Sequence, residues 1–414
     1  MVRLLGTERR RAGLVAALAA ALMLATAAVA QGSCTIGGPA TDQAEAAGIA
    51  QTTQSIGATV GDLNRDGRPD FLLNRAFSDT AREYLNQGGS FAEANAGTFV
   101  RNDKHGCAIA DVNGDGLPDI YCTVGASHGV DIKSNELWIQ QPDGSFKDEA
   151  AAWGVDDPVG RSRGAVFFDA NNDGWPDLFV ANFYPRPDGL PTPNRFYLND
   201  GGTGFRSAPE FGLNEQVGGL ALSPGCQVAG DYDGDGYQDL LVCGKDGVHL
   251  YHNDAGTGFT DVTDVMGLQG TWVGAAMVDF NRDGKLDLLL IKHDQFQLRL
   301  QGVNGRFREV SLKHALDGGR ALATGDVNGD GLPDLYVVQG AQGGGGTPNP
   351  PDIMYLNVDG TDVAPVPIPE TDQGNGASVS AIDYNGDGTA DFLVTNGARK
   401  LDGPVQLISF PPPG

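Results

Sequence analysis

Residues Asp326–Asp334 read Asp-Val-Asn-Gly-Asp-Gly-Leu-Pro-Asp, and they run directly into the apolar segment Leu335–Val338. The spacing Asp-x-Asn/Asp-x-Asp-Gly-x-x-Asp occurs seven times in the chain, and an apolar segment follows each copy. The other six copies begin at Asp62, Asp111, Asp169, Asp231, Asp279 and Asp383. Repetition of this kind indicates that one structural unit is built seven times.

The alternating oxygen side chains of this loop are of the kind that binds calcium. Ca²⁺ takes six to eight oxygen ligands at about 2.3–2.6 Å. In the copy at 326, the first, third, fifth and ninth positions are Asp326, Asn328, Asp330 and Asp334, and the carbonyl of Leu332 is a natural fifth ligand. The glycine at the sixth position suits a turn with positive φ, which glycine adopts without a steric penalty.

Two other interpretations of the loop are weaker. An EF-hand shares the opening but needs a glutamate at the twelfth position and a helix on each side. The residues at the twelfth position are Leu73, Cys122, Val180, Val242, Leu290, Val337 and Val394. Asp, Asn and Gly also gather in ordinary turns, which would explain one copy. Seven copies with oxygen side chains at all four positions favour a metal site.

The first thirty residues are typical of a secretory signal. Arg3 and Arg9–Arg11 precede an apolar core that begins at Ala12, and Ala28–Ala30 offers a cleavage site, so the mature chain is expected to begin at Gln31. The paired arginines leave a twin-arginine signal open as an alternative. No other stretch has the eighteen apolar residues of a membrane span. We therefore expect an exported, soluble protein that is secreted, periplasmic or at the cell surface.

The charge of the chain points away from nucleic acid. The formal net charge is −25, and most of the acidic excess lies in the seven loops. No basic stripe with interleaved aromatic residues is present, as a nucleic-acid surface would require. The acidity is therefore interpreted as metal-binding capacity.

The cysteines predict two disulfides, which persist in an oxidising compartment. Cys107 and Cys122 bracket the loop at 111, and Cys226 and Cys243 bracket the loop at 231. Both pairs have the same index sum relative to their loop, as expected for cross-strand pairs in an antiparallel hairpin, so Cys107–Cys122 and Cys226–Cys243 are predicted. Cys34 has no predicted disulfide partner, and it is either free or lipid-anchored.

Each repeat also predicts four short strands, and the repeats recur every 47 to 62 residues. One strand enters the loop, as at Ala58–Val60, and a continuous apolar strand leaves it, as at Phe71–Leu73, which indicates burial on both faces. A third strand follows, as at Glu83–Asn86, and a glycine turn opens a fourth, as at Gly89–Phe91. Seven such units predict an all-β fold, a seven-bladed β-propeller of four-stranded antiparallel blades with a calcium loop between the first two strands.

The ends of the sequence indicate how the ring closes. The last unit stops after a third strand near Val405–Phe410. Residues 44–49 resemble the fourth-strand region at Glu149–Val155. N-terminal residues near 39–49 are therefore expected to complete the last blade, within a single propeller domain over residues 31–414. Such closure removes the free sheet edges of an open ring.

With these loops and strands, the chain resembles the FG-GAP/VCBS repeat family, whose propeller is that of integrin α-chain heads. The segment Phe259–Leu268, Phe-Thr-Asp-Val-Thr-Asp-Val-Met-Gly-Leu, is also similar to cartilage-acidic-protein and ASPIC/UnbV-type bacterial proteins. The resemblance covers nearly all of residues 40–410. It implies up to seven Ca²⁺ ions, held by positions one, three, five, seven and nine of each loop.

The implied ligands, with position seven contributing its carbonyl, are Asp62, Asn64, Asp66, Arg68 and Asp70; Asp111, Asn113, Asp115, Leu117 and Asp119; Asp169, Asn171, Asp173, Trp175 and Asp177; Asp231, Asp233, Asp235, Tyr237 and Asp239; Asp279, Asn281, Asp283, Lys285 and Asp287; Asp326, Asn328, Asp330, Leu332 and Asp334; and Asp383, Asn385, Asp387, Thr389 and Asp391. Cationic side chains in the first and fifth loops are expected to weaken calcium there.

Basic and aromatic residues recur just before the first strand of several units, at the end away from the calcium loops. They are Lys104, His105, Arg161, Arg163, Trp272 and Arg320. First strands line the central channel of a propeller, so these residues are expected to surround one mouth of it. The hypothesis is a cationic, partly aromatic face that binds an anionic or carbohydrate ligand. The alternative is that Lys and Arg simply avoid the acidic loops.

Three classes of function fit the sequence. The first is a protein- or glycan-binding module for adhesion or recognition. The second is a calcium-dependent lyase or glycosidase, in which Lys104 or His105 would act as a base beside Arg163. The third is a structural or maturation factor. No Ser-His-Asp spacing, His-Glu-x-x-His motif or phosphate-binding glycine loop is present, so no catalytic residue is assigned, and binding is favoured.

Overall fold

A computed structural model describes residues 36–75, 80–99, 103–127, 131–183, 192–214, 226–244, 247–270, 272–292, 295–303, 305–312, 319–339, 350–368, 376–397 and 402–411. All of them fall in the unit Ser33–Gly414. The expected signal at 1–30 and Cys34 lie outside these ranges. None of the helices within the described ranges is long and apolar enough to cross a membrane.

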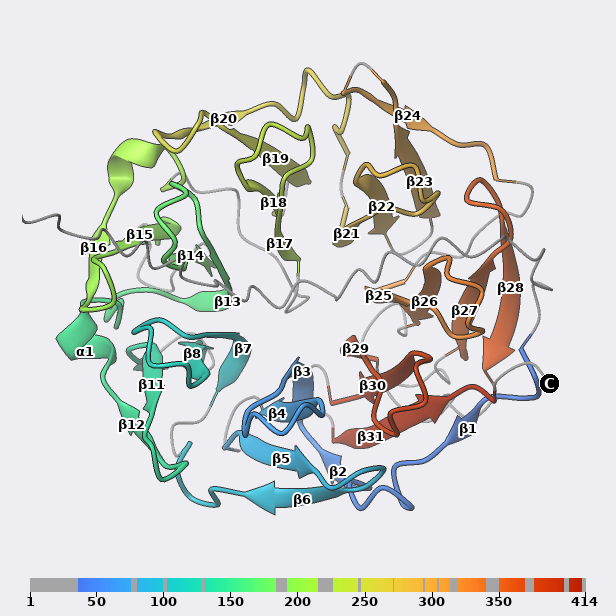
Figure 1. Ribbon diagram of the computed structural model, residues 1–414, viewed down its shortest axis with the longest axis horizontal. Coiled ribbons are helices and arrows are strands. Elements are labelled where there is room, and N and C mark those ends of the chain that lie inside the picture. The colour runs from blue at the N-terminus through green and yellow to red at the C-terminus, as the bar shows by residue number, and fades with distance from the viewer. Residues whose placement is uncertain are drawn as a thin grey trace, which may run out of the picture. The chain divides into compact units, whose positions relative to one another are not determined.

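Six four-stranded antiparallel sheets follow one another around a ring, and a seventh sheet completes it (Figure 1). Blades one to three are β3 (Ser55–Gly61), β4 (Asp70–Arg75), β5 (Arg82–Asn86) and β6 (Phe91–Ala94); β7 (Lys104–Ala110), β8 (Asp119–Val124), β11 (Glu136–Gln140) and β12 (Phe146–Asp148); and β13 (Ser162–Phe168), β14 (Asp177–Asn182), β15 (Arg195–Asn199) and β16 (Phe205–Ser207). Blades four to six are β17 (Gln227–Gly230), β18 (Asp239–Cys243), β19 (Val248–Asn253) and β20 (Phe259–Asp261); β21 (Gly274–Val278), β22 (Asp287–Lys292), β23 (Gln295–Gln301) and β24 (Phe307–Glu309); and β25 (Ala321–Gly325), β26 (Asp334–Val338), β27 (Asp352–Asn357) and β28 (Val363–Ile368). The predicted seven-bladed β-propeller is confirmed.

The seventh sheet combines both ends of the propeller. Its inner strands are β29 (Ser378–Ile382), β30 (Asp391–Thr395) and β31 (Gly403–Ser409). Two short strands from the beginning of the described chain, β1 (Thr41–Asp42) and β2 (Thr52–Thr53), pair antiparallel with β31. In Figure 1 the blue start of the chain accordingly runs beside red β31.

The second strand of each blade is the most buried, because it has a strand on either side and a neighbouring blade against each face. All six residues of β8 are buried. Apolar side chains of adjacent blades form shared clusters: Tyr121 and Leu137 of blade two pack with Leu178 and Tyr197 of blade three. Each blade thus completes its core with its neighbour, and the ring buries its apolar surface as one unit.

One segment differs from the expectation of strand. Residues 149–155 form a helical turn, α1 (Ala150–Trp153), rather than part of a fourth strand. Gly154 ends the turn with φ of 76°, and the N–H of Val155 bonds to the carbonyl of Ala150 at 2.9 Å. Residues 44–49 form the same turn, so their likeness in sequence reflects a shared capped turn. The other short elements are the hairpin β9 (Ala126–Ser127) and β10 (Asp131–Ile132) and the 3-10 turn η1 (Pro209–Phe211).

Candidate metal and ligand sites

The seven acidic loops share one conformation, which hydrogen bonds within the loop fix. In the sixth blade, Asp326 accepts the N–H of Gly331 at 2.7 Å. Asn328 accepts the N–H of Asp330 at 3.0 Å, and Asp330 accepts that of Leu332 at 2.8 Å. The bond from the sixth N–H to the first carboxylate recurs in the other six loops. The carboxylates of each loop are therefore gathered at one end of the hairpin between the first two strands.

Two positions of each loop have positive φ, of which only one was expected. The sixth position has φ between 82° and 92° in all seven loops, and it is always glycine. The fourth position is left-handed as well, at Arg65, Gly114, Asn172, Gly234, Arg282, Gly329 and Gly386. Five of these seven residues are Gly or Asn, the types that tolerate this region best. That bias in the sequence would have revealed the second turn.

The ninth position has a structural role besides its proposed role as a metal ligand. Asp119 is fully buried, and it accepts the N–H of Val112 at 3.0 Å and the N–H of Gln140 at 2.9 Å. It thereby ties its own loop to the third strand of the blade. The same pair of bonds occurs at Asp70, Asp177, Asp239, Asp287 and Asp334. Burial raises the pKa of Asp119 to about 7.

The seventh loop provides a test of whether these residues fit a cation. Asp391 is 1% exposed, yet neither of its carboxylate oxygens makes a well-formed hydrogen bond within the described residues. The hydroxyl of Ser409 and the N–H of Tyr384 lower its pKa, but burial outweighs them and raises it to about 7. A buried carboxylate with so few donors is stabilised by a cation. The residues present fit calcium, which would supply the missing positive charge.

Two loops contain cations of their own, as expected. Arg68 Nη2 contacts Asp66 Oδ2 at 2.5 Å in the first loop. Lys285 Nζ lies 3.2 Å from Asp283 Oδ2 in the fifth. Each cation occupies the fifth-position carboxylate that a metal would use. A calcium ion there would compete with these side chains, so these two loops are expected to have the lowest affinity for it.

Both predicted disulfides are present. Cys107–Cys122 joins β7 to β8, and Cys226–Cys243 joins the start of blade four to β18. Cys107 and Cys226 also line a cavity of about 250 Å³. The first strands of all seven blades contribute to its wall, including Ala58, Gly106, Gly164, Gln227, Ala275, Ala321 and Val379. Each disulfide therefore fixes an inner strand to its outer neighbour at the wall of the channel.

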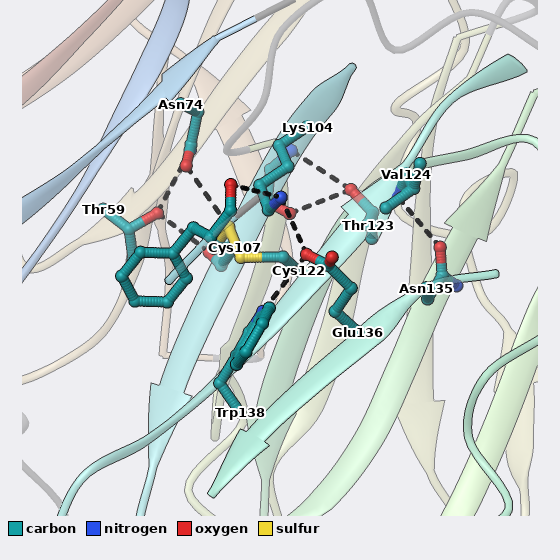
Figure 2. The surroundings of a disulfide bond; sticks show 12 residues. Thr59, Asn74, Lys104, Cys107, Cys122, Thr123, Val124, Asn135, Glu136 and Trp138 are labelled. Carbon is teal, nitrogen blue, oxygen red and sulfur yellow. Dashed lines mark hydrogen bonds and ion pairs between the residues drawn. A yellow bond between two sulfur atoms is a disulfide. The ribbon is translucent and has the colours of Figure 1, made fainter. Parts of the chain in front are cut away.

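Lys104 is buried beside the first disulfide (Figure 2). Its Nζ lies 2.8 Å from Glu136 Oε2, and both side chains are 0% exposed. Trp138 Nε1 donates to the same oxygen at 3.1 Å, and Glu136 pairs with Cys122 across the strands. Lys104 was expected to face a ligand, but its charge is neutralised inside the blade, so it is not part of a surface that a ligand could touch.

Three of the other expected ligand residues gather where blades two and three meet, on the side away from the acidic loops. The guanidinium carbons of Arg161 and Arg163 lie 4.5 and 5.2 Å from the ring centroid of Phe183. His105 Nε2 lies 3.3 Å from Asp103 Oδ1. We call these five residues the Arg–Phe cluster. Phe183 was not expected; its position directly after the second strand, at the same edge as Arg161, is the only indication in the sequence.

The Arg–Phe cluster carries excess positive charge. Burial lowers the pKa of His105, and the positive charge of Arg163 lowers it further, to about 4. The imidazole is therefore neutral at pH 7. Burial lowers the pKa of Arg163 to about 10, which leaves it charged at that pH. The cluster therefore holds two guanidinium groups against the single carboxylate of Asp103.

Trp272 and Arg320 lie elsewhere on the ring. Trp272 is 4% exposed and packs in the apolar cluster of blades four and five, with Lys292 Nζ 5.6 Å from the ring. Arg320 donates from Nη1 to the carbonyl of Gly376 at 3.1 Å, which joins blades six and seven. Of the six expected ligand residues, three therefore lie in the Arg–Phe cluster. Lys104 forms a buried ion pair, and Trp272 and Arg320 make separate contacts elsewhere.

Comparison with known proteins agrees with the fold and the loops. Five segments match the family of FG-GAP-like repeats: residues 62–122, 111–180, 231–290, 279–337 and 326–394. Cartilage acidic protein 1 of Mus musculus is 27% identical over 243 residues, which are 54% of this chain and 34% of that protein. The protein of the same name from Xenopus tropicalis is 24% identical over 390 residues, 84% of this chain and 58% of that protein. Human integrin alpha-7 is 31% identical over 128 residues, 29% of this chain and 10% of that protein.

A solved structure also shares the fold. It is a lectin from Agrocybe aegerita that recognises non-reducing terminal N-acetylglucosamine, and it superposes with a TM-score of 0.50 at 16% identity, covering 84% of this chain and 87% of the lectin. The chain spans about a third of the length of the mouse protein that it matches. Fold and loops together define a propeller built from seven acidic-loop repeats. The chain belongs to the family of FG-GAP-like repeats, whose matches cover more than half of it.

Proposed function

We propose that this protein is an exported, calcium-binding propeller that recognises an acidic glycan through the Arg–Phe cluster. Calcium in the acidic loops holds the hairpins of one face, and the ligand binds the opposite face. The two disulfides support export, because disulfides persist in oxidising compartments. The fold that this chain shares with a lectin that recognises N-acetylglucosamine is consistent with a recognition role for the scaffold. The protein is not proposed to bind nucleic acid or to need a transmembrane segment.

One observation carries the ligand assignment: the two guanidinium groups that Phe183 holds in place. Arginine matches the planar, paired oxygens of a carboxylate or sulfate, and its fork can donate two parallel hydrogen bonds. Ring contacts restrict Arg161 and Arg163 before any ligand arrives, which reduces the conformational entropy lost on binding. Two guanidinium groups held side by side favour an anionic ligand. A uronate or sulfated sugar has this chemistry.

Calcium has a structural part in this proposal. Each loop brings several carboxylates together, and their repulsion loosens the hairpin when no cation is bound. A ligand that binds only the folded state stabilises it by about 2.7 kcal/mol at a hundred times its dissociation constant. Extracellular calcium modules bind with dissociation constants of about 10⁻⁴–10⁻³ M. Weak sites in up to seven loops would therefore stabilise the propeller together.

The test is retention of the calcium-loaded mature protein on immobilised uronate-containing, sulfated and neutral polysaccharides. We expect retention on the acidic polymers, lost in the double variant Arg161→Gln/Arg163→Gln. Arg206→Gln is the matched control, because Arg206 is exposed and pairs only locally with Glu210. Loss in the double variant alone, with an unchanged melting temperature, supports the proposal.

Other outcomes of the same experiment separate the remaining classes of function. Equal retention of both variants would place the glycan site elsewhere on the propeller. Shortened or unsaturated products would show a polysaccharide-active enzyme rather than a binding module. Retention on no polymer would contradict glycan binding and favour a protein partner or a structural role.

A further inference from the structure

The fourth blade differs from the others at two positions that meet in space. The third position of its acidic loop is Asp233, whereas the other six loops have Asn there. The penultimate residue of its third strand is His252, whereas the matching residues of the other five complete repeats are Leu85, Ile139, Leu198, Leu300 and Leu356. In blade four, a carboxylate therefore replaces the amide of the loop, and an imidazole replaces the apolar side chain of the third strand.

These residues form a cluster of three metal-ligating groups with Asp239, the ninth residue of the loop. His252 Nδ1 lies 3.3 Å from Asp233 Oδ2 and 3.4 Å from Asp239 Oδ1. The three ligand atoms all lie within 4.8 Å of one another. Nδ1 itself is buried and makes no well-formed hydrogen bond within the described residues. The imidazole therefore directs an unused nitrogen at two carboxylates.

The surroundings hold the cluster in place without a metal. Asp239 is 0% exposed and accepts the N–H groups of Tyr232 and Asn253, at 2.9 and 2.8 Å. Tyr232 also packs edge-on against His252, with ring centroids 6.3 Å apart and planes at 77°. A carboxylate oxygen has two lone pairs, so Asp239 can accept an N–H and bind a cation at once. These contacts hold two of the three ligands, Asp239 and His252, in place before a metal binds.

We propose that His252, Asp233 and Asp239 form a site for a transition-metal ion of the zinc class, distinct in chemistry from the calcium sites of the other loops. Calcium prefers oxygen ligands, whereas imidazole with carboxylate suits zinc and its neighbours. Zinc binds these ligands at about 2.0–2.2 Å, usually in a tetrahedron. A tetrahedron of that size has edges of about 3.3–3.6 Å, and the two distances from His252 fall in this range.

Solvent can complete the coordination. The side chains of His252 and Asp233 are 28% and 27% exposed, so solvent reaches both residues. The fourth blade would then carry one zinc-class ion, and calcium would remain the ion of the all-oxygen loops. This inference modifies the calcium proposal for one loop only, and it holds whichever ligand the opposite face binds.

The experiment is a titration of the intact mature protein, in calcium, with Co²⁺, whose visible absorption reports tetrahedral coordination, followed by displacement with Zn²⁺. We expect the wild type to take up one equivalent that His252→Leu lacks. Leucine is the residue of four matching positions, so this variant should fold, and an unchanged melting temperature in calcium checks that. Asp233→Asn, which restores the amide of the other loops, should lose the same equivalent.

His249→Gln is the matched control, because His249 lies on the same strand but pairs with Asp261 at 2.9 Å. It should keep the full uptake. Equal uptake by wild type and His252→Leu would overturn the proposal, and would show that His252 is only an ion-pair partner of the two carboxylates. Complete displacement of Co²⁺ by millimolar calcium would overturn it too. Failure of glycan retention would leave this result unchanged, so the two proposals are tested separately.

Discussion

Asn86 donates a hydrogen bond from Nδ2 to the main-chain carbonyl of Tyr384 at 2.9 Å, across 298 positions of the sequence. Asn86 ends the third strand of blade one, and Tyr384 is the second residue of the acidic loop of blade seven. The same bond joins five further pairs of adjacent blades: Gln140 to Leu63, Asn199 to Val112, Asn253 to Ala170, Gln301 to Tyr232 and Asn357 to Phe280. Each acidic loop in these pairs is thus fixed to the blade that follows it.

Replacing the amide that closes the ring should destabilise the protein. Asn86→Leu leaves the part-buried Tyr384 carbonyl without this donor and also removes the bonds to the Pro69 carbonyl and from the N–H of Gly88; one unsatisfied buried group costs about 1–3 kcal/mol, which is a lower limit for the loss. Denaturant unfolding should show a loss of at least this size. Gln87→Leu, at an exposed neighbouring position, should have little effect. An equal loss in both variants would show that apolar substitution, rather than the missing bond, is responsible.

Removal of calcium should lower the melting temperature markedly. Several weak sites that bind only the folded state contribute together, each by about 2.7 kcal/mol at a hundredfold excess over its dissociation constant. Excess EDTA should lower the melting temperature, and added calcium should restore it. A melting temperature that excess EDTA leaves unchanged would contradict calcium binding by the loops.

Two ninth-position aspartates should respond differently to amide substitution in calcium-free protein. Asp119→Asn replaces one acceptor oxygen by an NH₂ group and should cost about 1–3 kcal/mol, because a buried main-chain N–H then loses its partner. Asp391 makes no well-formed bond of this kind within the described residues, so Asp391→Asn should be neutral or stabilising without calcium and destabilising with it. Denaturant unfolding in EDTA and in calcium checks this. Equal effects of both variants in both conditions would refute the distinction.

Asp352 should make stability fall as the pH rises. Burial raises its pKa from 3.8 to about 7, so the folded state holds a proton that the unfolded state has released. The stabilisation is complete below about pH 4 and disappears as the pH rises through about 7. The difference in unfolding free energy between wild type and Asp352→Asn should therefore change across this range. A difference independent of pH would show an ordinary pKa for Asp352.

Opening the disulfide of blade two should destabilise the channel wall. Cys107 and Cys122 are 15 residues apart, and a loop of that length corresponds to about 3 kcal/mol of stabilisation through the unfolded state. Cys107→Ser/Cys122→Ser should lower the unfolding free energy by about this amount. Wild type under reducing conditions is unsuitable as a comparison, because Cys226–Cys243 would open as well. A double variant as stable as wild type would indicate compensating strain in the native bond.

Repetition made the fold predictable from the sequence, whereas side-chain contacts between the strands and loops of one blade did not follow from it. Seven copies of one spacing predicted seven blades, and a shared index sum predicted both disulfides. The burial of Lys104 depends on Glu136, which reaches it from another strand. The ligation proposed for His252 depends equally on a loop outside its own strand. Such partners lie on different strands and loops of one blade, and the spacing of the repeat does not show which side chains meet, so they became visible only once the sheets were assembled.

The pairing of β1 with β31 also sets an order of events. Thr41 of β1 lies opposite Ser409 of β31, so this pairing cannot form until β31 has been synthesised. Pairings of such sequence separation form slowly, and the emerging chain must pass much of its synthesis with an unclosed edge. A copy truncated before β31 would keep that edge open. The seventh blade can therefore complete its sheet only after β31 has been synthesised.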